Sequence, residues 1–563
     1  MGHLKRTLER RLGANRREFF KRAGGAALAV GTPSMLSACG GRGDDDPIPS
    51  SPGSGLFRHG VASGDPLADR VILWTRVTPD TSATVTVECT VATDPSFASI
   101  VARFGLSTDA TRDYTVKTDV LGLQQNTTYY YRFSTSGVQS TIGRTRTLPT
   151  GAASRCRMAV VSCANLAQGF FNAYRRVAER ADLDLVLHLG DYMYEYSNDS
   201  GNVRAHEPAV ETVTLSDYRT RHSQYKRDAD LQELHRQHPV IAVWDDHDVA
   251  SNANATGAQN HTEGAEGTWT GRVNAALQAY YEWMPIRVDD PTNLRKNNRS
   301  FAYGNLLDLL MLEERLLARS PQLSGNTSIQ GVFTQSGAFA DASRQMLGSE
   351  EEGWLAAKLR SSMASWRLIG QGVMFAQLKI EPESNANGGG RFINADQWDG
   401  YQPARNRLFE VLKGNASTPA VGNVVMLTGD AHSSWASDLT VDPNNSDTGS
   451  GGYNPSSGAG SLAVEFVGTS VTSPAILDLG GLVASAVRLI NPHIKYVELT
   501  KRGYMLIDAD STRVVSEWWY VDTVASSSTG QSFGAAFQVQ AGSNRVVPAG
   551  QTSPRTNPPA LAP

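Results

Sequence analysis

The chain has 563 residues, 40% of them hydrophobic, with 52 Lys and Arg against 56 Asp and Glu. This length suffices for two or three domains, and the 10 Trp, 18 Tyr and 17 Phe exclude disorder for most of it. The first 38 residues hold eight basic and two acidic side chains, so 44 basic groups face 54 acidic ones in the remainder. We expect no nucleic-acid partner, because phosphate backbones bind clustered Lys and Arg. No apolar run reaches 18 residues, which predicts no transmembrane span in the mature protein.

The N-terminus has the pattern of an export signal. Arg16 and Arg17 precede two aromatic residues, and a weakly apolar stretch rich in Ala and Gly follows at 23–30. This arrangement is typical of a twin-arginine signal. The alternative, a basic amphipathic helix of the folded protein, is disfavoured by the glycines and the proline that follow.

A lipobox-like sequence, Leu-Ser-Ala-Cys-Gly, ends at residue 40 and would make Cys39 the lipidated first residue. Plain cleavage after the same small residues stays open. We therefore predict a signal in residues 1–39 and a flexible linker in 40–55. The predicted location is periplasmic, membrane-tethered or extracellular, with a lipid anchor at Cys39.

Residues 56–150 are predicted to form a small β domain. Strand-like runs at 70–76, 83–89 and 128–133 are separated by clusters of Gly, Pro, Asp and Ser, as in an antiparallel sandwich. The alternation of Tyr129, Tyr131 and Phe133 resembles the tyrosine-corner strand of a fibronectin-III or immunoglobulin-like fold, with Trp74 as its core tryptophan. We expect this domain to act as a scaffold.

In residues 151–525, strands alternate with helices predicted at 169–180, 272–284 and 345–361. Four apolar runs are each followed by side chains of metal-ligand type. The pairs are 158–161 with Cys163, 183–189 with Asp191 and Tyr194, 240–244 with Asp245 to Asp248, and 424–428 with Asp430 and His432. Ligands of α/β sheets bind outside the carboxyl ends of strands. The four runs therefore predict one site at which these side chains converge.

Each motif also has a structural explanation. A Gly-Asp pair after a strand is more often a turn or a helix cap than a ligand. The three carboxylates of 245–248 repel one another unless a cation neutralises them, although a solvated loop could hold them. Asp430 and His432 leave an extended segment on the same side. If Cys39 is lipidated, three cysteines remain, so at least one lacks a disulfide partner, and Cys163 is the candidate thiolate ligand.

The donor types indicate two kinds of metal ion. Hard carboxylates suit Ca²⁺, Mg²⁺ or Mn²⁺, whereas a thiolate, an imidazole and a phenolate favour a transition metal. Because the ordinary pKa of tyrosine is about 10, ligation by Tyr194 favours Fe³⁺. Neighbouring cations of this kind can clamp the attacking and departing oxygens of a displacement at phosphorus.

Several longer strings resemble one family. HLGDYMYEY, VWDDHDV, LTGDAHSSWASDL, GVASGDPLADRVILWTRVTP and NPHIKYVELTKRGY are similar to motifs of the PhoD-like alkaline phosphatases and phosphodiesterases, relatives of the purple acid phosphatases. The resemblance covers about residues 56–525. It implies an α+β or α/β chain in which the small β-sandwich precedes a calcineurin-like metallophosphatase β-sandwich flanked by helices. It also implies a phosphate-ester substrate, with Fe³⁺ and Ca²⁺ as cofactors, although other divalent ions stay open.

The resemblance carries over to individual residues. It implies seven metal ligands: Cys163, Asp191, Tyr194, Asp246, Asn252, Asp430 and His432. It makes His247 a phosphate contact that protonates the leaving group, and Asn252 a metal or phosphate contact, while Asp245 could replace Asp246. The segment 312–316, LEERL, departs from the expected Leu-Asp-Thr-Arg, so we expect this strand end to be less involved, and the role of Arg315 stays open. Residues 385–390 and a C-terminal tail, 526–563, receive no role.

The functional prediction is an exported, monomeric phosphohydrolase that cleaves phosphomonoesters, phosphodiesters or both to scavenge phosphate. One alternative is a phospholipase D-like phosphodiesterase acting on lipid head groups or cell-wall polymers. Another is a surface-tethered binding protein, which would not need the carboxylate clusters.

Overall fold

The structure is a computed structural model that describes residues 55–386 and 389–563. The predicted twin-arginine signal, the lipobox at Cys39 and nearly all of the predicted linker lie outside the described residues. Within the described ranges, no helix combines the length and the apolar character needed to cross a membrane.

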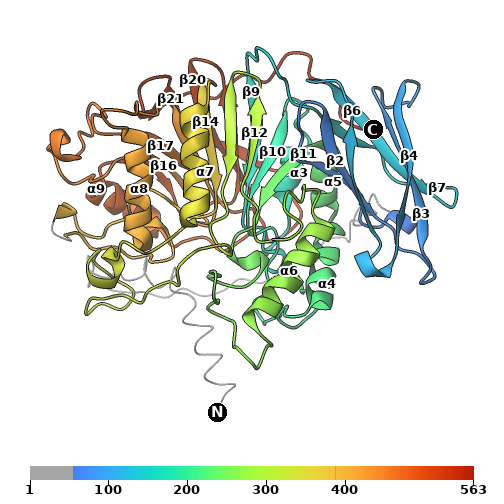
Figure 1. The fold of residues 1–563 in the computed structure, drawn as a ribbon, viewed down its shortest axis with the longest axis horizontal. Coiled ribbons are helices and arrows are strands. Elements are labelled where there is room, and N and C mark those ends of the chain that lie inside the picture. Colours follow the sequence, from blue (N-terminus) through green and yellow to red (C-terminus); the bar gives the residue numbers. More distant parts are fainter. Residues whose placement is uncertain (1–54, 387–388) are drawn as a thin grey trace, which may run out of the picture.

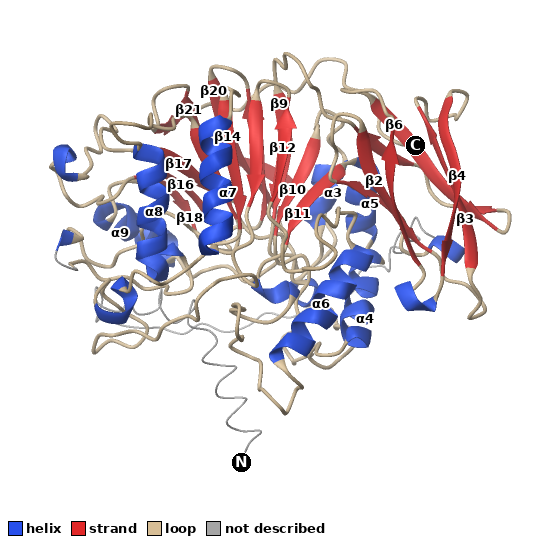
Figure 2. Cartoon of the chain, viewed as in Figure 1, coloured by secondary structure: helices blue, strands red, loops and turns tan. Residues whose placement is uncertain are grey.

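Two large β-sheets face each other, with helices on their outer faces (Figures 1 and 2). The first has ten strands in the order β22 (Val546–Pro548), β21 (Gln531–Gln540), β20 (Arg513–Val521), β19 (Gly503–Ala509), β9 (Cys156–Val161), β10 (Leu185–Leu189), β11 (Pro239–Val243), β1 (Val61–Gly64), β2 (Arg70–Arg76) and β5 (Thr115–Leu121). The second has seven, in the order β12 (Arg299–Tyr303), β13 (Leu307–Met311), β14 (Trp366–Gln371), β15 (Val424–Thr428), β17 (Ala463–Val467), β16 (Ser434–Leu439) and β18 (Ile494–Glu498).

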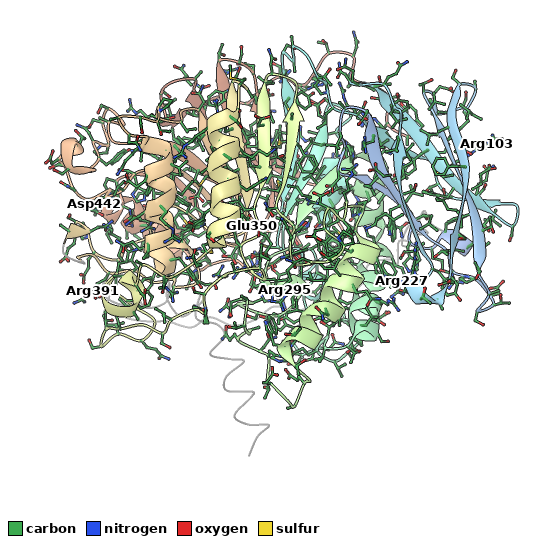
Figure 3. The ribbon with its side chains drawn as sticks, viewed as in Figure 1. Arg103, Arg227, Arg295, Glu350, Arg391 and Asp442 are labelled. Atoms are coloured by element: carbon green, nitrogen blue, oxygen red, sulfur yellow. The ribbon has the colours of Figure 1, made fainter. Side chains whose placement is uncertain are left out.

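Apolar side chains fill the space between the sheets, among them Leu187 and Ile241 from one and Leu368 and Leu427 from the other. The first sheet is covered by α3 (Asn172–Ala178), α4 (Leu215–Lys226), α5 (Ala229–Gln237) and α6 (Trp269–Trp283). The second is covered by α7 (Gly348–Ser361), α8 (Gln402–Lys413) and α9 (Leu482–Ile490). Strands buried on both faces have continuous apolar runs, which is why the predicted positions of β9, β10, β11 and β15 are confirmed. Charged side chains such as Arg103 and Glu350 lie on the surface (Figure 3).

The small N-terminal unit adds a third sheet. Its order is β4 (Ile100–Thr108), β3 (Val85–Ala92), β6 (Thr128–Thr135) and β7 (Val138–Gln139), with β8 (Gly143–Arg146) also paired to β6. This sheet shares a core with β2 and β5, to which Tyr129, Tyr131 and Phe133 contribute. However, β1 pairs in parallel with β11, so half of the small unit is continuous with the ten-stranded sheet.

Trp74 was predicted to lie in the core of the small unit, and this prediction is wrong. Its indole packs against Trp283 of α6, with ring centroids 5.8 Å apart, and its N–H donates to the Glu282 carbonyl (2.8 Å). Neighbouring residues of a strand point to opposite faces, so Trp74 faces away from the core that Leu73 enters.

The segment beyond residue 525, expected to be a tail, is part of the fold. It supplies β21 and β22 and then returns toward the N-terminal unit, where the Tyr130 hydroxyl donates to the Ala560 carbonyl (2.7 Å). The C-terminal end lies near β6 in Figure 1. Its polar sequence concealed β21, which lies between β20 and the short edge strand β22 and is mostly exposed or half-buried.

The junction of β1 with β11 predicts a stability effect. A Cβ at Gly64 would overlap the carbonyl oxygens of Pro285 and Val240, whereas one at Gly105 in β4 would meet open space. Gly64→Ala should cost about 1–3 kcal/mol of stability and lower activity, because β11 leads directly into 245–248. Gly105→Ala should change stability by less than about 0.5 kcal/mol. Equal thermal unfolding midpoints for the two variants would contradict this account of the junction.

Candidate metal centre

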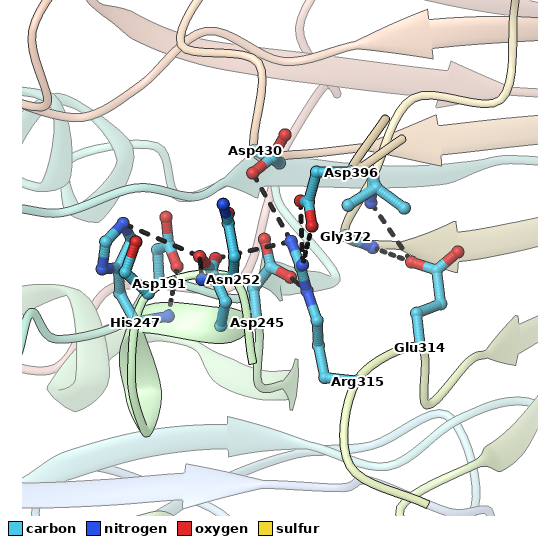
Figure 4. Close-up of polar contacts among 12 residues, drawn as sticks. Asp191, Asp245, His247, Asn252, Glu314, Arg315, Gly372, Asp396 and Asp430 are labelled. Carbon is cyan, nitrogen blue, oxygen red and sulfur yellow. Dashed lines mark hydrogen bonds and ion pairs between the residues drawn. The ribbon is translucent and has the colours of Figure 1, made fainter. Parts of the chain in front are cut away.

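The carboxyl ends of both sheets meet at one place. β9, β10 and β11 run parallel to one another, and so do β13, β14, β15 and β17. The loops that follow β10 and β11 bring their polar side chains beside those that follow β13 and β15 (Figure 4).

Donor atoms of these side chains form three overlapping groups, each with its atoms within 4.8 Å of one another. The groups are Cys163, Asp191 and His432; Asp191, Asp246 and His247; and Asp245, Asp246 and Asp430. Asp191 belongs to the first two groups and Asp246 to the last two. The cluster is therefore continuous, with a thiol and an imidazole at one end and carboxylates alone at the other.

Tyr194 joins the thiol end. Its hydroxyl donates to Asp191 Oδ2 (2.8 Å), lies 3.3 Å from His432 Nε2 and accepts a hydrogen bond from the Ser473 hydroxyl (2.6 Å). Burial raises the pKa of both the Cys163 thiol and the Tyr194 phenol well above their usual values, and the Asp191 charge adds to both effects. A thiolate and a phenolate would therefore need a strongly polarising cation beside them, so these donors fit a transition metal.

The carboxylate end surrounds Arg315. This guanidinium is fully buried and pairs with Asp245 and Asp396, the latter at 2.9 Å. It also lies 3.4 Å from Asp246 and 3.6 Å from Asp430 (Figure 4). Arg319 also pairs with Asp396 (2.7 Å), so two fixed cations face four carboxylates, and the excess negative charge fits hard cations.

The structure bears on two expectations about the carboxylate end of the cluster. The strand end at 312–316 was expected to be less involved, yet it delivers Arg315 to the middle of the cluster, while Glu314 accepts the Gly372 N–H (2.7 Å) and so joins the ends of β13 and β14. Asp245 and Asp246 are placed differently: Asp245 pairs closely with Arg315 and belongs to one donor group, whereas Asp246 belongs to two.

Several donors have backbone angles that residues other than glycine rarely adopt. The φ values of Cys163, Asp191, Asn252, Asp430 and His432 lie between 52° and 59°. Such positions cost of order 1–3 kcal/mol each and concentrate at functional sites. The sequence predicts an extended segment at 430–432, but the positive φ values show that it is not extended. Its two donors belong to different groups.

His247 is held on three sides. Its Nδ1 lies 2.8 Å from the buried Glu195 carboxylate, its ring stacks on Tyr194 at 4.4 Å, and its Nε2 lies 3.9 Å from Asp246. Burial alone would lower its pKa, but Tyr196, Asp246 and Glu195 outweigh burial and raise the pKa well above its usual value. These three groups therefore favour the protonated imidazole.

Asn252 reaches the centre through its backbone. Its N–H donates to Asp246 Oδ2 (2.6 Å), whereas its side-chain amide donates to Gln259 (2.8 Å).

Sequence reasoning did not find three further residues of the site: Glu195, Asp396 and Ser473. Glu195 directly follows Tyr194 and could have been found, but no apolar run precedes Asp396 to mark it.

Facing sheets with thiol, phenol, imidazole and carboxylate donors at their strand ends characterise a metal-dependent phosphoric ester hydrolase. A family model described as "PhoD-like phosphatase" matches residues 158–518, and one for the N-terminal domain of that family matches 44–149. The chain belongs to the PhoD-like phosphatase family. The family and the hydrolase activity predicted from the sequence are confirmed.

Two relatives support the assignment. The chain is 37% identical over 472 residues to alkaline phosphatase D of Bacillus subtilis (strain 168), covering 80% of this chain and 75% of that protein. A solved structure of PhoD matches with a TM-score of 0.77 and 33% identity, covering 90% of this chain and 94% of that one.

The stability lost on removing metal should depend on pH. Burial raises the pKa of Asp191 to about 7, and it raises the pKa of Asp245 and Asp248 well above the usual range. At these carboxylates the folded, chelated protein binds more protons than the unfolded chain between about pH 4 and 7, so their contribution to stability falls as the pH rises through that window. Buried histidines with lowered pKa values, such as His188 and His222, act in the opposite direction, but they do so with and without metal. Calorimetry should therefore show that chelation lowers the unfolding midpoint more at pH 7.5 than at pH 5.5. An equal or smaller effect of chelation at pH 7.5 would refute this reasoning.

Proposed function

We propose that this phosphoric ester hydrolase holds Fe³⁺ between Cys163, Asp191, Tyr194 and His432, and Ca²⁺ or another hard divalent ion beside Asp246 and Asp430. The observation that carries the proposal is the change of donor type along one cluster, from thiol, phenol and imidazole to carboxylates alone. Asn252, whose N–H bonds Asp246, is the remaining candidate ligand. The ions would supply Lewis-acid stabilisation of charge on the phosphoryl group.

The protein's own groups position and protonate the substrate. His247 is the candidate donor of a proton to the leaving oxygen, and Glu195 at Nδ1 leaves Nε2 free to face the centre. Tyr196 packs edge-on against His247 (5.0 Å between centroids) and is 37% exposed, so it marks the side open to solvent. Arg315, 0% exposed and surrounded by carboxylates, acts as a positioning residue rather than a phosphate contact.

The substrates proposed are phosphomonoesters, phosphodiesters or both, hydrolysed to release phosphate. Export by the twin-arginine route, to a periplasmic, membrane-tethered or extracellular location, is supported by Arg16, Arg17 and the apolar stretch after them. A lipid anchor at Cys39 and a monomeric state complete the proposal.

Because Tyr129 accepts the Gln124 N–H (2.7 Å) as in a tyrosine corner, we assign the N-terminal unit to the fibronectin-III or immunoglobulin-like class, with a scaffolding role.

Metal content tests the proposed centre. Elemental analysis should find iron together with calcium or another hard divalent ion, and the protein should absorb visible light through phenolate-to-iron charge transfer. Tyr194→Phe should abolish this band. Tyr192→Phe should keep it, because the Tyr192 hydroxyl bonds His235 (2.9 Å) instead. Zinc alone, without a visible band, would exclude the proposed iron.

Leaving-group dependence tests the role of His247. His247→Ala should lower turnover by about 10²- to 10⁴-fold while metal content stays near normal. The loss should be larger for alkyl phosphates than for nitrophenyl phosphates, whose phenolate departs without a proton. Asp191→Ala should inactivate the enzyme on both, because it removes a donor shared by two groups. If His247→Ala strips the metal and shows no leaving-group dependence, His247 is a ligand.

A further inference from the structure

A polar cavity of about 330 Å³, apart from the metal centre, lies where three parts of the chain meet. Its walls include Asn126 and Arg146 from the N-terminal unit, Arg155 just before β9, Tyr303 at the end of β12, and Arg555 and Thr556 from the C-terminal segment. No Asp or Glu is among the described residues that line it. At about 3.3 Å per strand residue, Arg155 is roughly 25 Å from Cys163, so one small anion cannot touch both this cavity and the metal centre.

The three arginines of the cavity are supported by acids behind its wall. Arg555 pairs with Asp184, Arg146 lies 3.5 Å from the same carboxylate, and Arg155 bonds Asp508 (2.8 Å). Both acids are buried. One further arginine, Arg157, pairs with Asp508 and with Asp182. These pairs join four arginines to three aspartates, and the charged side chains among the described wall residues of the cavity are all arginines.

The arginines also retain unused donors. The Nε atoms of Arg146 and Arg555 are buried and have no hydrogen-bond partner. These two atoms have less than 1 Å² of accessible surface, so an anion in the cavity would bind other parts of the guanidinium groups. The side chains of Arg146, Arg155 and Arg555 are 14%, 29% and 20% exposed, which leaves part of each one accessible from the cavity. Guanidinium groups bind tetrahedral oxyanions through paired N–H donors, which makes a phosphate-like anion the acceptor that fits.

We propose that this cavity binds a tetrahedral oxyanion and that its ligand is inorganic phosphate, the product of the hydrolase reaction. The site is separate from the metal centre and does not depend on which metals that centre holds. Because Arg146, Arg155 and Arg555 come from three segments, bound phosphate connects the N-terminal unit, the start of β9 and the C-terminal segment. Accumulated product therefore stabilises the junction of these parts.

Calorimetric titration of the metal-loaded enzyme with inorganic phosphate tests the proposal. The parent should show two classes of phosphate site. Arg146→Gln and Arg555→Gln should each weaken the second class by about tenfold or more, the effect of losing a charge-assisted hydrogen bond. Turnover and competitive inhibition by phosphate should stay as in the parent. Arg103→Gln, which removes an exposed arginine of β4 that lies 3.7 Å from Glu88, should leave both classes intact.

A direct measurement does not depend on whether the variants fold. Crystals of the unmodified metal-loaded enzyme soaked in tungstate should give an anomalous peak between Arg146, Arg155 and Arg555, in addition to any at the metal centre. A single class of phosphate site in the parent, tungstate at the metal centre alone, or a second class that survives both substitutions would overturn the proposal.

Discussion

The structure depends on bringing carboxylates together out of water. Asp245, Asp246, Asp396 and Asp430 lie around Arg315 with almost no exposed surface, and Asp191 is fully buried next to them. Like charges at these separations repel strongly, and burial adds the cost of desolvation to each. Arg315, together with Arg319 on Asp396 (2.7 Å), supplies two positive charges, which cannot balance these five carboxylates. The remaining negative charge must be neutralised by proton uptake, as the raised pKa of Asp191 indicates, or by bound cations. The same buried carboxylates therefore bind the metal ions used in catalysis and make the stability of the site depend on them.

The fold makes this concentration of charge possible because it fixes the backbone position of each donor residue. Parallel strands end at the same edge, so a residue placed just after each strand is held in position by an apolar core. Left-handed backbone at Cys163, Asp191, Asp430 and His432 then turns each side chain away from its strand direction. That conformational cost is sustained because the strands on either side are buried. Glycine at 190 serves the same arrangement, since a Cβ there would overlap Asp245.

Much of this could be predicted from the sequence, for a definite reason. Strands buried on both faces leave continuous apolar runs, and donors that directly follow such runs, like Asp191 and Asp430, are legible. The rest depended on tertiary structure. Asp396 has no strand before it, Arg315 acquires its role only from the four acids around it, and Trp74 lies in a strand whose two faces both pack. The pairing of β1 with β11 joins residues far apart in sequence, which no local pattern reveals.

An anomalous-difference map collected at the iron absorption edge from crystals of the metal-loaded protein tests the central claim most directly. Our account predicts a peak among Cys163, Asp191, Tyr194 and His432. The hard divalent ion should appear as electron density among the carboxylates beside Arg315, without an iron-edge signal. If no metal lies at either position while the enzyme in the crystal remains active, buried carboxylates do not require cations here and the account is wrong.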